Sequence, residues 1–296
     1  MAKRSDIVVG VIIGVSVLIF FFFLLLGILG LSGERASLLG GFGKKVAIID
    51  VVGVISNSED VIRQLKRYTQ DSSVPSIVLN IDSPGGGIAP SQEIFEEIKK
   101  AKGKGKKVVA SMSSMAASGG YYIACAADTI VANPGSITGS IGVIFEFPVA
   151  EKLFKKIGLE FEVVKSGEVK DMGTFTRPMT EKERRLLQAV INDVYDQFVN
   201  VLVEQRKIPK EEVLKFADGR IFTGNQAKQL GLVDVIGDLE DAIKIAGKMG
   251  GIEGPPTTVK EKKRKVTLLE LLSQRFDGLL NLNPINSGPE FMYIFK

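Results

Sequence analysis

The sequence contains no histidine and only one cysteine among its 296 residues. Without an imidazole, a serine nucleophile must pass its proton to another base, and lysine or a carboxylate are the candidates that remain. The lone Cys125 cannot form an internal disulfide, and a zinc-binding cluster of cysteine and histidine is excluded. The fold must therefore be held by packing, and a serine–histidine mechanism is excluded.

Two binding signatures are also missing. Neither the Gly-x-x-x-x-Gly-Lys-Ser/Thr phosphate loop nor the Gly-x-Gly-x-x-Gly dinucleotide pattern follows a predicted strand, so a nucleotide enzyme is not expected. The 38 basic and 34 acidic residues give a net charge of +4, which is too balanced to indicate a nucleic-acid partner. We expect no nucleic acid, no metal and no cofactor.

The chain does have one long apolar run. Ile7–Leu31 are 25 consecutive uncharged residues and include Phe20–Phe23. As a helix this run would be about 37 Å long, enough to cross a hydrocarbon core of about 30 Å. A cleaved signal peptide is the alternative, but its apolar core would be about 7 to 15 residues and end in a small-residue site, which is only faintly matched here. We expect a membrane anchor, although basic residues flank it almost equally and do not orient it.

The remaining sequence predicts one α/β domain with two C-terminal appendages. Short Val/Ile-rich runs alternate with amphipathic ones, which indicates parallel strands separated by helices and covered on both faces. The expected strands are 46–55, 76–82, 107–112 and 129–132, and the expected helices between them are 59–68, 91–102 and 119–127. Farther along, residues 161–165 are expected to be extended, and capping boxes at Thr180 and Thr223 predict two helix starts. The predicted divisions are a tail 1–6, the anchor 7–31, a spacer 32–44, the catalytic domain 45–249, a basic linker 250–265 and a C-terminal segment 266–296.

The last segment carries its own hypothesis. Phe291–Phe295 form an apolar extended peptide on a tether, so this tail could occupy a peptide-binding groove of its own chain or of a neighbour. A packing or membrane-associated segment is the alternative, and the sequence does not choose between them.

The first glycine-rich segment of interest is Asp82–Gly87, directly after an apolar strand. Pro84 prevents the strand ladder from continuing, and the glycines allow a positive φ, so the N–H groups of Gly85 and Gly86 can point into a cleft. Such donors could bind an oxyanion. A tight turn at a helix start is the simpler interpretation.

Ser118 is the second feature of interest, because it stands between small residues at the start of a predicted helix. A serine at a helix N-terminus lies at the positive end of the peptide dipoles, and the N–H of Gly119 would lie beside a tetrahedral intermediate formed at its oxygen. The pattern is not the Gly-x-Ser-x-Gly elbow, since Ala116 holds the first glycine position. A close-packed helix start is therefore an equal alternative to a nucleophile.

The third glycine-rich segment, Thr138–Gly142, is followed by a stretch that contains candidate lysines. Lys165 and Lys170 both lie there, and their spacing does not choose between them. A lysine acts as a base only when it is neutral, so its pKa must fall from about 10.4 toward 7 to 8. Such a shift requires a site that excludes water.

Four segments in order resemble the signal peptide peptidase A family of the short, single-domain type. They are Asp82–Gly87, Met115–Tyr122, Thr138–Val143 and Ala217–Gly224. The resemblance covers about residues 45–248. It implies the fold of the Clp protease and crotonase superfamily, with repeated ββα-type units and a parallel sheet. It also implies a single-pass protein of the cell membrane whose catalytic domain lies outside the cytoplasm.

The resemblance assigns roles to individual residues. Ser118 matches the nucleophile, Lys170 the general base and Ser140 the residue that orients the lysine amine, while Gly85 and Gly119 match the oxyanion donors. Short members of the family resemble homo-oligomeric rings in which neighbours complete each active site. A single protomer is therefore expected to be inactive.

The resulting prediction is a membrane-anchored serine endopeptidase with a Ser–Lys dyad that hydrolyses hydrophobic peptides such as residual signal peptides. Proteases hold extended peptides by strand addition. The candidate substrate-binding edges are therefore two short segments, formed by Gly86, Gly87 and Ile88 and by Ile141, Gly142 and Val143. Two alternatives stand beside this prediction: a crotonase-type acyl-CoA enzyme and a non-catalytic membrane scaffold.

Overall fold

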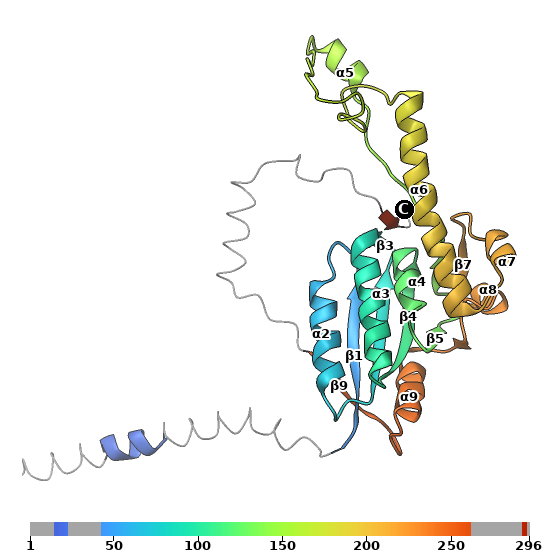
Figure 1. Ribbon diagram of the computed structural model, residues 1–296. Helices are drawn as coiled ribbons and strands as arrows, with labels where there is room; N and C mark the ends of the chain where they lie inside the picture. Colours follow the sequence, from blue (N-terminus) through green and yellow to red (C-terminus); the bar gives the residue numbers. More distant parts are fainter. Residues whose placement is uncertain (1–14, 23–42, 262–291, 295–296) are drawn as a thin grey trace, which may run out of the picture. The chain divides into compact units, whose positions relative to one another are not determined.

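The computed structural model describes residues 15–22, 43–261 and 292–294 (Figure 1). The chain divides into one unit up to Gly43 and another from Lys44 onward. In the first unit residues 15–22 are helical, and the rest of the predicted anchor lies outside the described residues. Within the described ranges, no helix is both long and apolar enough to cross a membrane.

The second unit is built on a mostly parallel sheet. Its central strands β4, β2, β1 and β9 pair in parallel in that order, whereas β7 pairs antiparallel with β6 at the other end. The strands are β1 Lys45–Val52, β2 Ser76–Ser83, β4 Lys107–Ala117, β5 Thr129–Ala132, β6 Ile137–Gly139, β7 Ile221–Thr223, β8 Val235–Ile236 and β9 Thr257–Lys260. The predicted α/β class with a parallel sheet is confirmed.

Helices cover both faces of this sheet, because the side chains of each strand alternate between two apolar clusters. Ala47 and Ile49 of β1 face a large cluster with α2, α3, α4 and α6, whereas Val46 and Ile48 face a smaller one with α9. The helices are α2 Glu59–Gln70, α3 Ile88–Gly103, α4 Gly119–Ala124, α5 Glu151–Lys156, α6 Glu181–Arg206, α7 Lys210–Leu214, α8 Gly224–Gln229 and α9 Leu239–Met249. The capping boxes expected at Thr180 and Thr223 are both present.

Strand β4 is longer than the sequence predicts and changes its neighbour halfway. It pairs with β5 through Val109–Met112 and then with β6 through Met115–Ala117. The predicted end near Met112 rested on the polar residues that follow, but the new neighbour β6 keeps the backbone ladder intact. This extension carries the chain directly to Ser118.

Other boundaries also differ from the expectation. Helix α3 begins at Ile88, three residues earlier than predicted, and α4 ends at Ala124 rather than Ala127. Residues 257–260, which lie in the expected linker, form β9 and pair in parallel with β1, so the sheet continues past residue 249. The alternation of Thr258 and Val259 is too short to stand out as a strand in the sequence.

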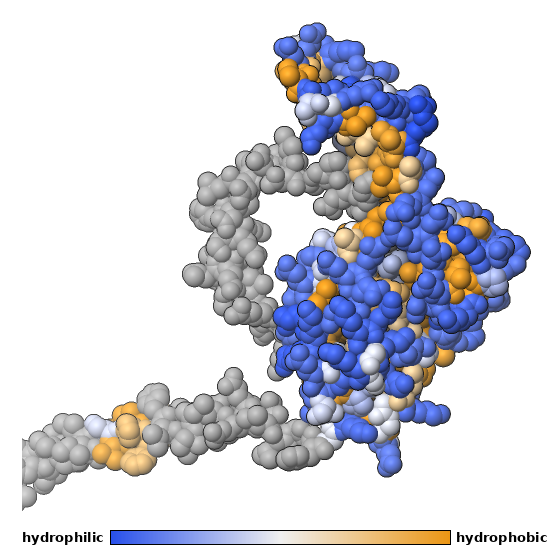
Figure 2. All heavy atoms as spheres, viewed as in Figure 1, coloured by the Kyte–Doolittle hydropathy of each residue, from blue (hydrophilic) through white to orange (hydrophobic). Residues whose placement is uncertain are grey.

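Residues 144–179, here called the arm, connect β6 to α6 and extend away from the sheet (Figure 1). The arm contains the short helix α5 and otherwise turns and irregular backbone, and no strand forms over the expected extended stretch 161–165. Three phenylalanines, Phe154, Phe161 and Phe175, pack on one another with ring centroids 4.8 to 6.0 Å apart. Several other apolar side chains of the arm stay exposed (Figure 2), among them Leu153, Ile157 and Val164.

Candidate active site

The Asp82–Gly87 segment ends β2 and forms a second, very short strand, β3 Gly85–Gly87. Ser83 Oγ donates to the Gly53 carbonyl at 2.6 Å and accepts from the Gly85 N–H at 3.0 Å. The Asp82 carboxylate accepts from the Met115 N–H at 3.1 Å, which ties the end of β2 to the second half of β4. These side chains therefore fold the glycine segment back along the end of the sheet.

Strand β3 has one edge fixed by Ile55. The Ile55 N–H donates to the Gly85 carbonyl at 2.9 Å, and the Gly87 N–H donates to the Ile55 carbonyl at 2.8 Å. Because neighbouring residues of an extended strand direct their polar groups to opposite sides, the N–H and C=O of Gly86 face the other edge. A Cβ at Gly86 would lie 2.4 Å from the Ile55 carbonyl oxygen, so this close approach requires glycine.

The other edge of β3 is occupied by the C-terminal tail. The backbone of β10 Met292–Ile294 pairs antiparallel with β3, with Tyr293 opposite Gly86. Both strands also lie against α4, whose N-terminus carries Ser118. The edge predicted to receive an extended peptide therefore holds one in this structure, and that peptide is the tail.

Ser118 lies where β4 ends and α4 begins. Its N–H donates to the Gly139 carbonyl at 2.8 Å, and its φ of 53° is a sparsely populated conformation for a residue with a side chain. The residue is 1% exposed, and its Oγ has no hydrogen-bond partner in the part of the chain that the structure describes. A buried, unpaired hydroxyl on a strained turn is an unstable arrangement unless another group completes it.

Ser140 lies next to Ser118, because β6 pairs with the end of β4 and brings Gly139 opposite Ala117. It too has a positive φ, 50°, and it is 7% exposed. Its N–H donates to the Arg220 carbonyl at 2.8 Å, and the Gly219 N–H donates to the Ile141 carbonyl at 3.1 Å. The Ala217–Gly224 segment, whose role the sequence left open, therefore holds the turn at Ser140 by backbone bonds.

The backbone N–H groups of the expected oxyanion donors differ in whether they already have a hydrogen-bond acceptor. The Gly85 N–H is already bonded to Ser83 Oγ, whereas the Gly86 N–H faces the edge that the tail occupies. Gly119 is the first residue of α4, so its N–H has no acceptor within the helix. The role of Gly85 and Gly119 as oxyanion donors stays a prediction, and the bond from the Gly85 N–H to the Ser83 hydroxyl is a contact that the sequence does not reveal.

The second expected edge, Ile141–Val143, does not form a strand within the described residues. Ile141 is buried, while Gly142 and Val143 are half-buried beside the Asp218–Arg220 turn. Ile88 is buried as the first residue of α3. Only the Gly86–Gly87 part of the predicted substrate-binding set lies on a paired strand edge.

The two candidate lysines have different surroundings. The Lys165 amine forms an ion pair with Asp171 at 2.5 Å and donates to the Glu168 carbonyl at 2.7 Å. Lys170 is exposed on a turn of the arm, and none of the described residues forms an ion pair or side-chain hydrogen bond with it. Lys165 is therefore committed to a structural contact, whereas Lys170 is available. A Ser118–Lys170 hydrogen bond does not form within this single chain.

Cys125 is not a second nucleophile. It is buried at the opposite end of α4 from Ser118, and burial raises the pKa of its thiol to about 12. The thiol stays protonated at neutral pH and behaves as a small apolar side chain.

Comparisons with known proteins identify the family of this chain. Residues 100–253 match the model of peptidase family S49, and residues 44–136 match the Clp protease model. A Synechocystis protein named as a protease is 45% identical over 211 residues, which are 71% of this chain and 76% of that protein. A signal peptide peptidase SppA from Enterococcus faecium is 38% identical over 217 residues, 69% of this chain and 63% of that protein. Protease 4 from Haemophilus influenzae is 35% identical over 214 residues, 69% of this chain but only 35% of that protein.

The S49 match begins within α3 and includes β4, Ser118 and Ser140, while the Clp match covers β1 to β5 and includes the glycine strand β3. Together the two matches cover residues 44–253, which include β3, Ser118 and Ser140. The chain belongs to peptidase family S49, the signal peptide peptidase A family, and it is a serine protease with a Clp-like fold.

Proposed function

We propose that this protease hydrolyses hydrophobic peptides, residual signal peptides among them, with Ser118 as nucleophile and Lys170 as general base. The observation that carries the proposal is the pairing of Met292–Ile294 with Gly85–Gly87 beside α4. It supports a groove in which an extended peptide backbone runs next to the Ser118 hydroxyl. Backbone pairing of this kind selects for extended chains rather than for one sequence.

The chemistry follows from the two side chains. Neutral Lys170 takes the proton of Ser118 Oγ, and the resulting oxygen attacks the peptide carbonyl. The ammonium then protonates the leaving amine, and the neutral lysine activates the water that hydrolyses the acyl-enzyme. Backbone N–H donors, with Gly119 and Gly86 as the best candidates, stabilise the oxyanion by about 3 kcal/mol each. The Ser140 hydroxyl orients the lysine amine.

Lys170 reaches Ser118 from a neighbouring copy in a homo-oligomeric ring. Three features of the single chain support this arrangement: a buried Ser118 hydroxyl without a partner among the described residues, an exposed Lys170, and an arm with exposed apolar side chains such as Val164 and Ile157. Val164 is 96% exposed and Ile157 65%, which is unfavourable in water and favours burial against another protein surface. Contact with the neighbour would bury these side chains and exclude water from the lysine, which favours its neutral form.

The membrane anchor remains part of this proposal. Its support is the 25-residue uncharged run Ile7–Leu31, which is long enough to span a bilayer. A single-pass anchor with the catalytic domain outside the cytoplasm would place the groove beside peptides left in the membrane. Protease accessibility of residues 45–249 in intact spheroplasts tests the orientation: digestion from outside is expected, and complete protection would contradict it.

The decisive test uses the full-length protein in detergent with a panel of hydrophobic peptides. A serine-reactive phosphonate is expected to label wild type at Ser118 and not Ser118→Ala, and both Ser118→Ala and Lys170→Ala are expected to lose peptidase activity. Lys156→Ala, at an exposed lysine of α5 in the same arm, serves as the matched lysine control and keeps the dyad. Full activity of Lys170→Ala in a folded particle would overturn the proposed base, and activity of Ser118→Ala would overturn the nucleophile.

A further inference from the structure

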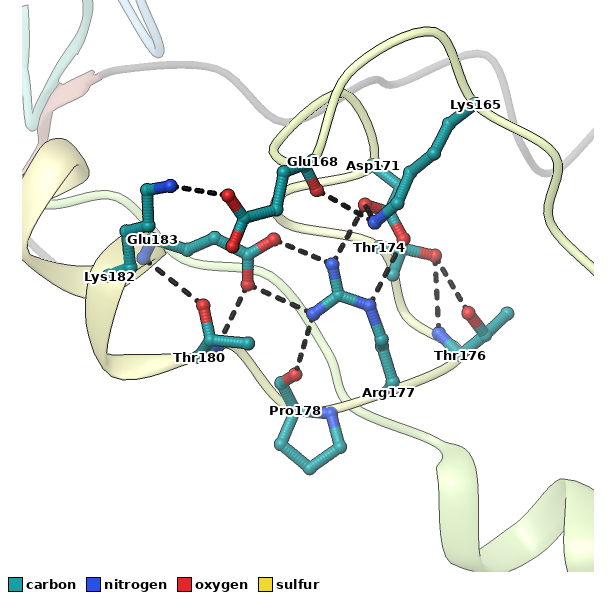
Figure 3. Close-up of polar contacts among 10 residues, drawn as sticks. All are labelled: Lys165, Glu168, Asp171, Thr174, Thr176, Arg177, Pro178, Thr180, Lys182 and Glu183. Atoms are coloured by element: carbon teal, nitrogen blue, oxygen red, sulfur yellow. Dashed lines mark hydrogen bonds and ion pairs between the residues drawn. The ribbon is translucent and has the colours of Figure 1, made fainter.

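A network of charged side chains surrounds the residue next to the proposed base (Figure 3). Arg177 binds the Asp171 carboxylate through both a 3.0 Å bond from Nε and a 2.8 Å bond from Nη2. The same guanidinium binds the Glu183 carboxylate through Nη1 at 2.9 Å and Nη2 at 2.6 Å. Asp171 directly follows Lys170 in the chain. Arg177 thus joins the turn that carries Lys170 to the start of α6.

Glu183 makes a rigid anchor for this connection. It is the third residue of α6, its carboxylate accepts from the Thr180 N–H at 2.8 Å, and its side chain is only 3% exposed. Helix α6 is in turn held by core side chains, of which Phe198 and Leu202 are fully buried. A displacement of Arg177 relative to α6 would therefore break its two charged hydrogen bonds to Glu183.

The charges in the network are balanced, and they favour the ionised carboxylates. The Arg177 and Lys165 side chains hold the pKa of Asp171 well below its usual range, and Arg177, with the Thr180 backbone, lowers the pKa of Glu183 to about 2. Two carboxylates beside one guanidinium and one ammonium leave no net charge. The network therefore stays intact at neutral pH.

Among the described residues, the side-chain contacts of Asp171 hold the Lys170 turn most strongly. Residues 166–173 are turns and bends. Lys165, which also pairs with Asp171, belongs to the same segment and does not join it to α6, and the ion pair between Lys182 and Glu168 joins two exposed side chains. Exposed pairs of this kind contribute little, whereas bidentate pairs to arginine define both distance and orientation. The backbone position of Lys170 depends on the carboxylate of its neighbour.

We propose that Arg177 is a positioning residue for the reaction: by clamping Asp171 onto Glu183 it fixes the turn from which Lys170 reaches Ser118 of a neighbouring copy. The inference rests on the proposed Ser118–Lys170 dyad. A lysine has a long flexible side chain, and a shift of about 1 Å in a catalytic group lowers a rate by about 100-fold. Arg177 touches neither the substrate nor the reacting atoms, and it acts on the rate through the Lys170 backbone.

The experiment compares Arg177→Ala and Arg177→Lys with Arg184→Ala. Arg184 is a nearby arginine in the first turn of α6, and its exposed pair with Glu181 is long, at 3.8 Å. For each assembled full-length variant, kcat, KM and the pH dependence of kcat are measured. Arg177→Ala is expected to lower kcat by about 100-fold with KM within threefold, and to shift the limb of the pH profile that reports the lysine. Arg177→Lys, which keeps the charge but not the bidentate geometry, is expected to recover only part of the rate. Arg184→Ala is expected to match wild type.

Guanidinium ion provides a readout that a purely structural role would not move. Added at millimolar concentration, it is expected to restore part of the kcat of Arg177→Ala and to leave Lys170→Ala unchanged. The inference is overturned if Arg177→Ala or, where that variant fails to assemble, Arg177→Lys keeps a kcat within twofold of wild type. It is also overturned if the loss follows dissociation of the particle and guanidinium restores nothing. If Lys170→Ala is itself active, the proposed dyad fails and this inference fails with it. If Lys170→Ala is inactive but Arg177→Ala is active, the dyad stands and only the positioning role of Arg177 is rejected.

Discussion

The sheet edge that carries Ser118 and the arm that carries Lys170 are held in different ways. Ser118 is buried and is fixed by backbone hydrogen bonds from β4, β6 and α4. Lys170 is exposed on a turn without a strand or helix, fixed by ionic side-chain contacts of its neighbours. The proposed nucleophile is thus positioned by the fold of one chain, and the proposed base by charged side-chain contacts on an exposed surface. The two halves of the site should respond differently to mutation, to acid and to assembly.

The largest effect on peptidase activity is expected from substitution of the buried Ser118. Ser118→Ala removes one oxygen from a packed site, so the fold should persist while peptidase activity falls by at least about 10⁴-fold. Circular dichroism and peptide hydrolysis measured on the same preparation check both parts. Residual activity within 100-fold of wild type would show that another group attacks the substrate.

The glycine strand offers the next comparison. Gly86→Ala would place a Cβ 2.4 Å from the Ile55 carbonyl oxygen, which must displace β3 and is expected to lower kcat/KM by about 100-fold. Gly103→Ala at the end of α3 is the control, because a Cβ there meets nothing within 4 Å and alanine stabilises a helix by about 0.5 to 1 kcal/mol. Equal activity of the two variants would contradict the role of β3 as the substrate edge.

Removal of the tail has a smaller expected effect. Deletion of residues 291–296 frees the edge of β3 from an intramolecular competitor, so KM for peptides should fall by about threefold to tenfold, with kcat unchanged. Deletion of Lys296 alone is the control, since it leaves β10 in place. Unchanged kinetics after the larger deletion, with an intact tail shown by mass spectrometry in wild type, would mean that the tail does not compete with substrate.

The smallest effect is expected from acid, which should loosen the arm and leave the sheet edge that carries Ser118 intact. Asp171 and Glu183 have lowered pKa values in the folded arm, so their contribution to stability is present above about pH 4 and is lost as the pH falls from about 4 toward 2. Pepsin is expected to cut the arm a few times faster at pH 2.5 than at pH 4, relative to its own activity on an unfolded substrate, while β1 stays protected. In Arg177→Ala the arm should be cut rapidly at pH 4 already. If pepsin at pH 2.5 cut the sheet before the arm, the expected difference between the two regions would be contradicted.

The sequence predicted best what depends on local pattern. The β5 strand and the capping boxes at Thr180 and Thr223 follow from hydrophobic runs and side-chain spacing, and they agree with the structure. The extension of β4 past Met112 could not be predicted, because it depends on β6 replacing β5 as a neighbour. The choice between Lys165 and Lys170 was open for a similar reason. Asp171 engages Lys165 in a contact that spacing alone does not reveal.

The expected oxyanion donors also depend on a contact that the sequence does not reveal. Gly85 matches the family pattern, and the structure adds that its N–H donates to the Ser83 hydroxyl, which is why the proposal above favours Gly86 and Gly119 as donors. For the C-terminal tail, the sequence left two alternatives, a peptide in the groove or a packing or membrane-associated segment. The backbone pairing of Met292–Ile294 with β3 favours the first.

The most direct test of the account mixes two inactive variants. In a ring where each Ser118 receives Lys170 from the next copy, particles reassembled from equal amounts of Ser118→Ala and Lys170→Ala contain sites with an intact serine from one variant and an intact lysine from the other. Random neighbours then give about a quarter of the wild-type sites, and about a quarter of wild-type activity is predicted. A mixture that assembles fully and remains as inactive as either variant alone would contradict the account.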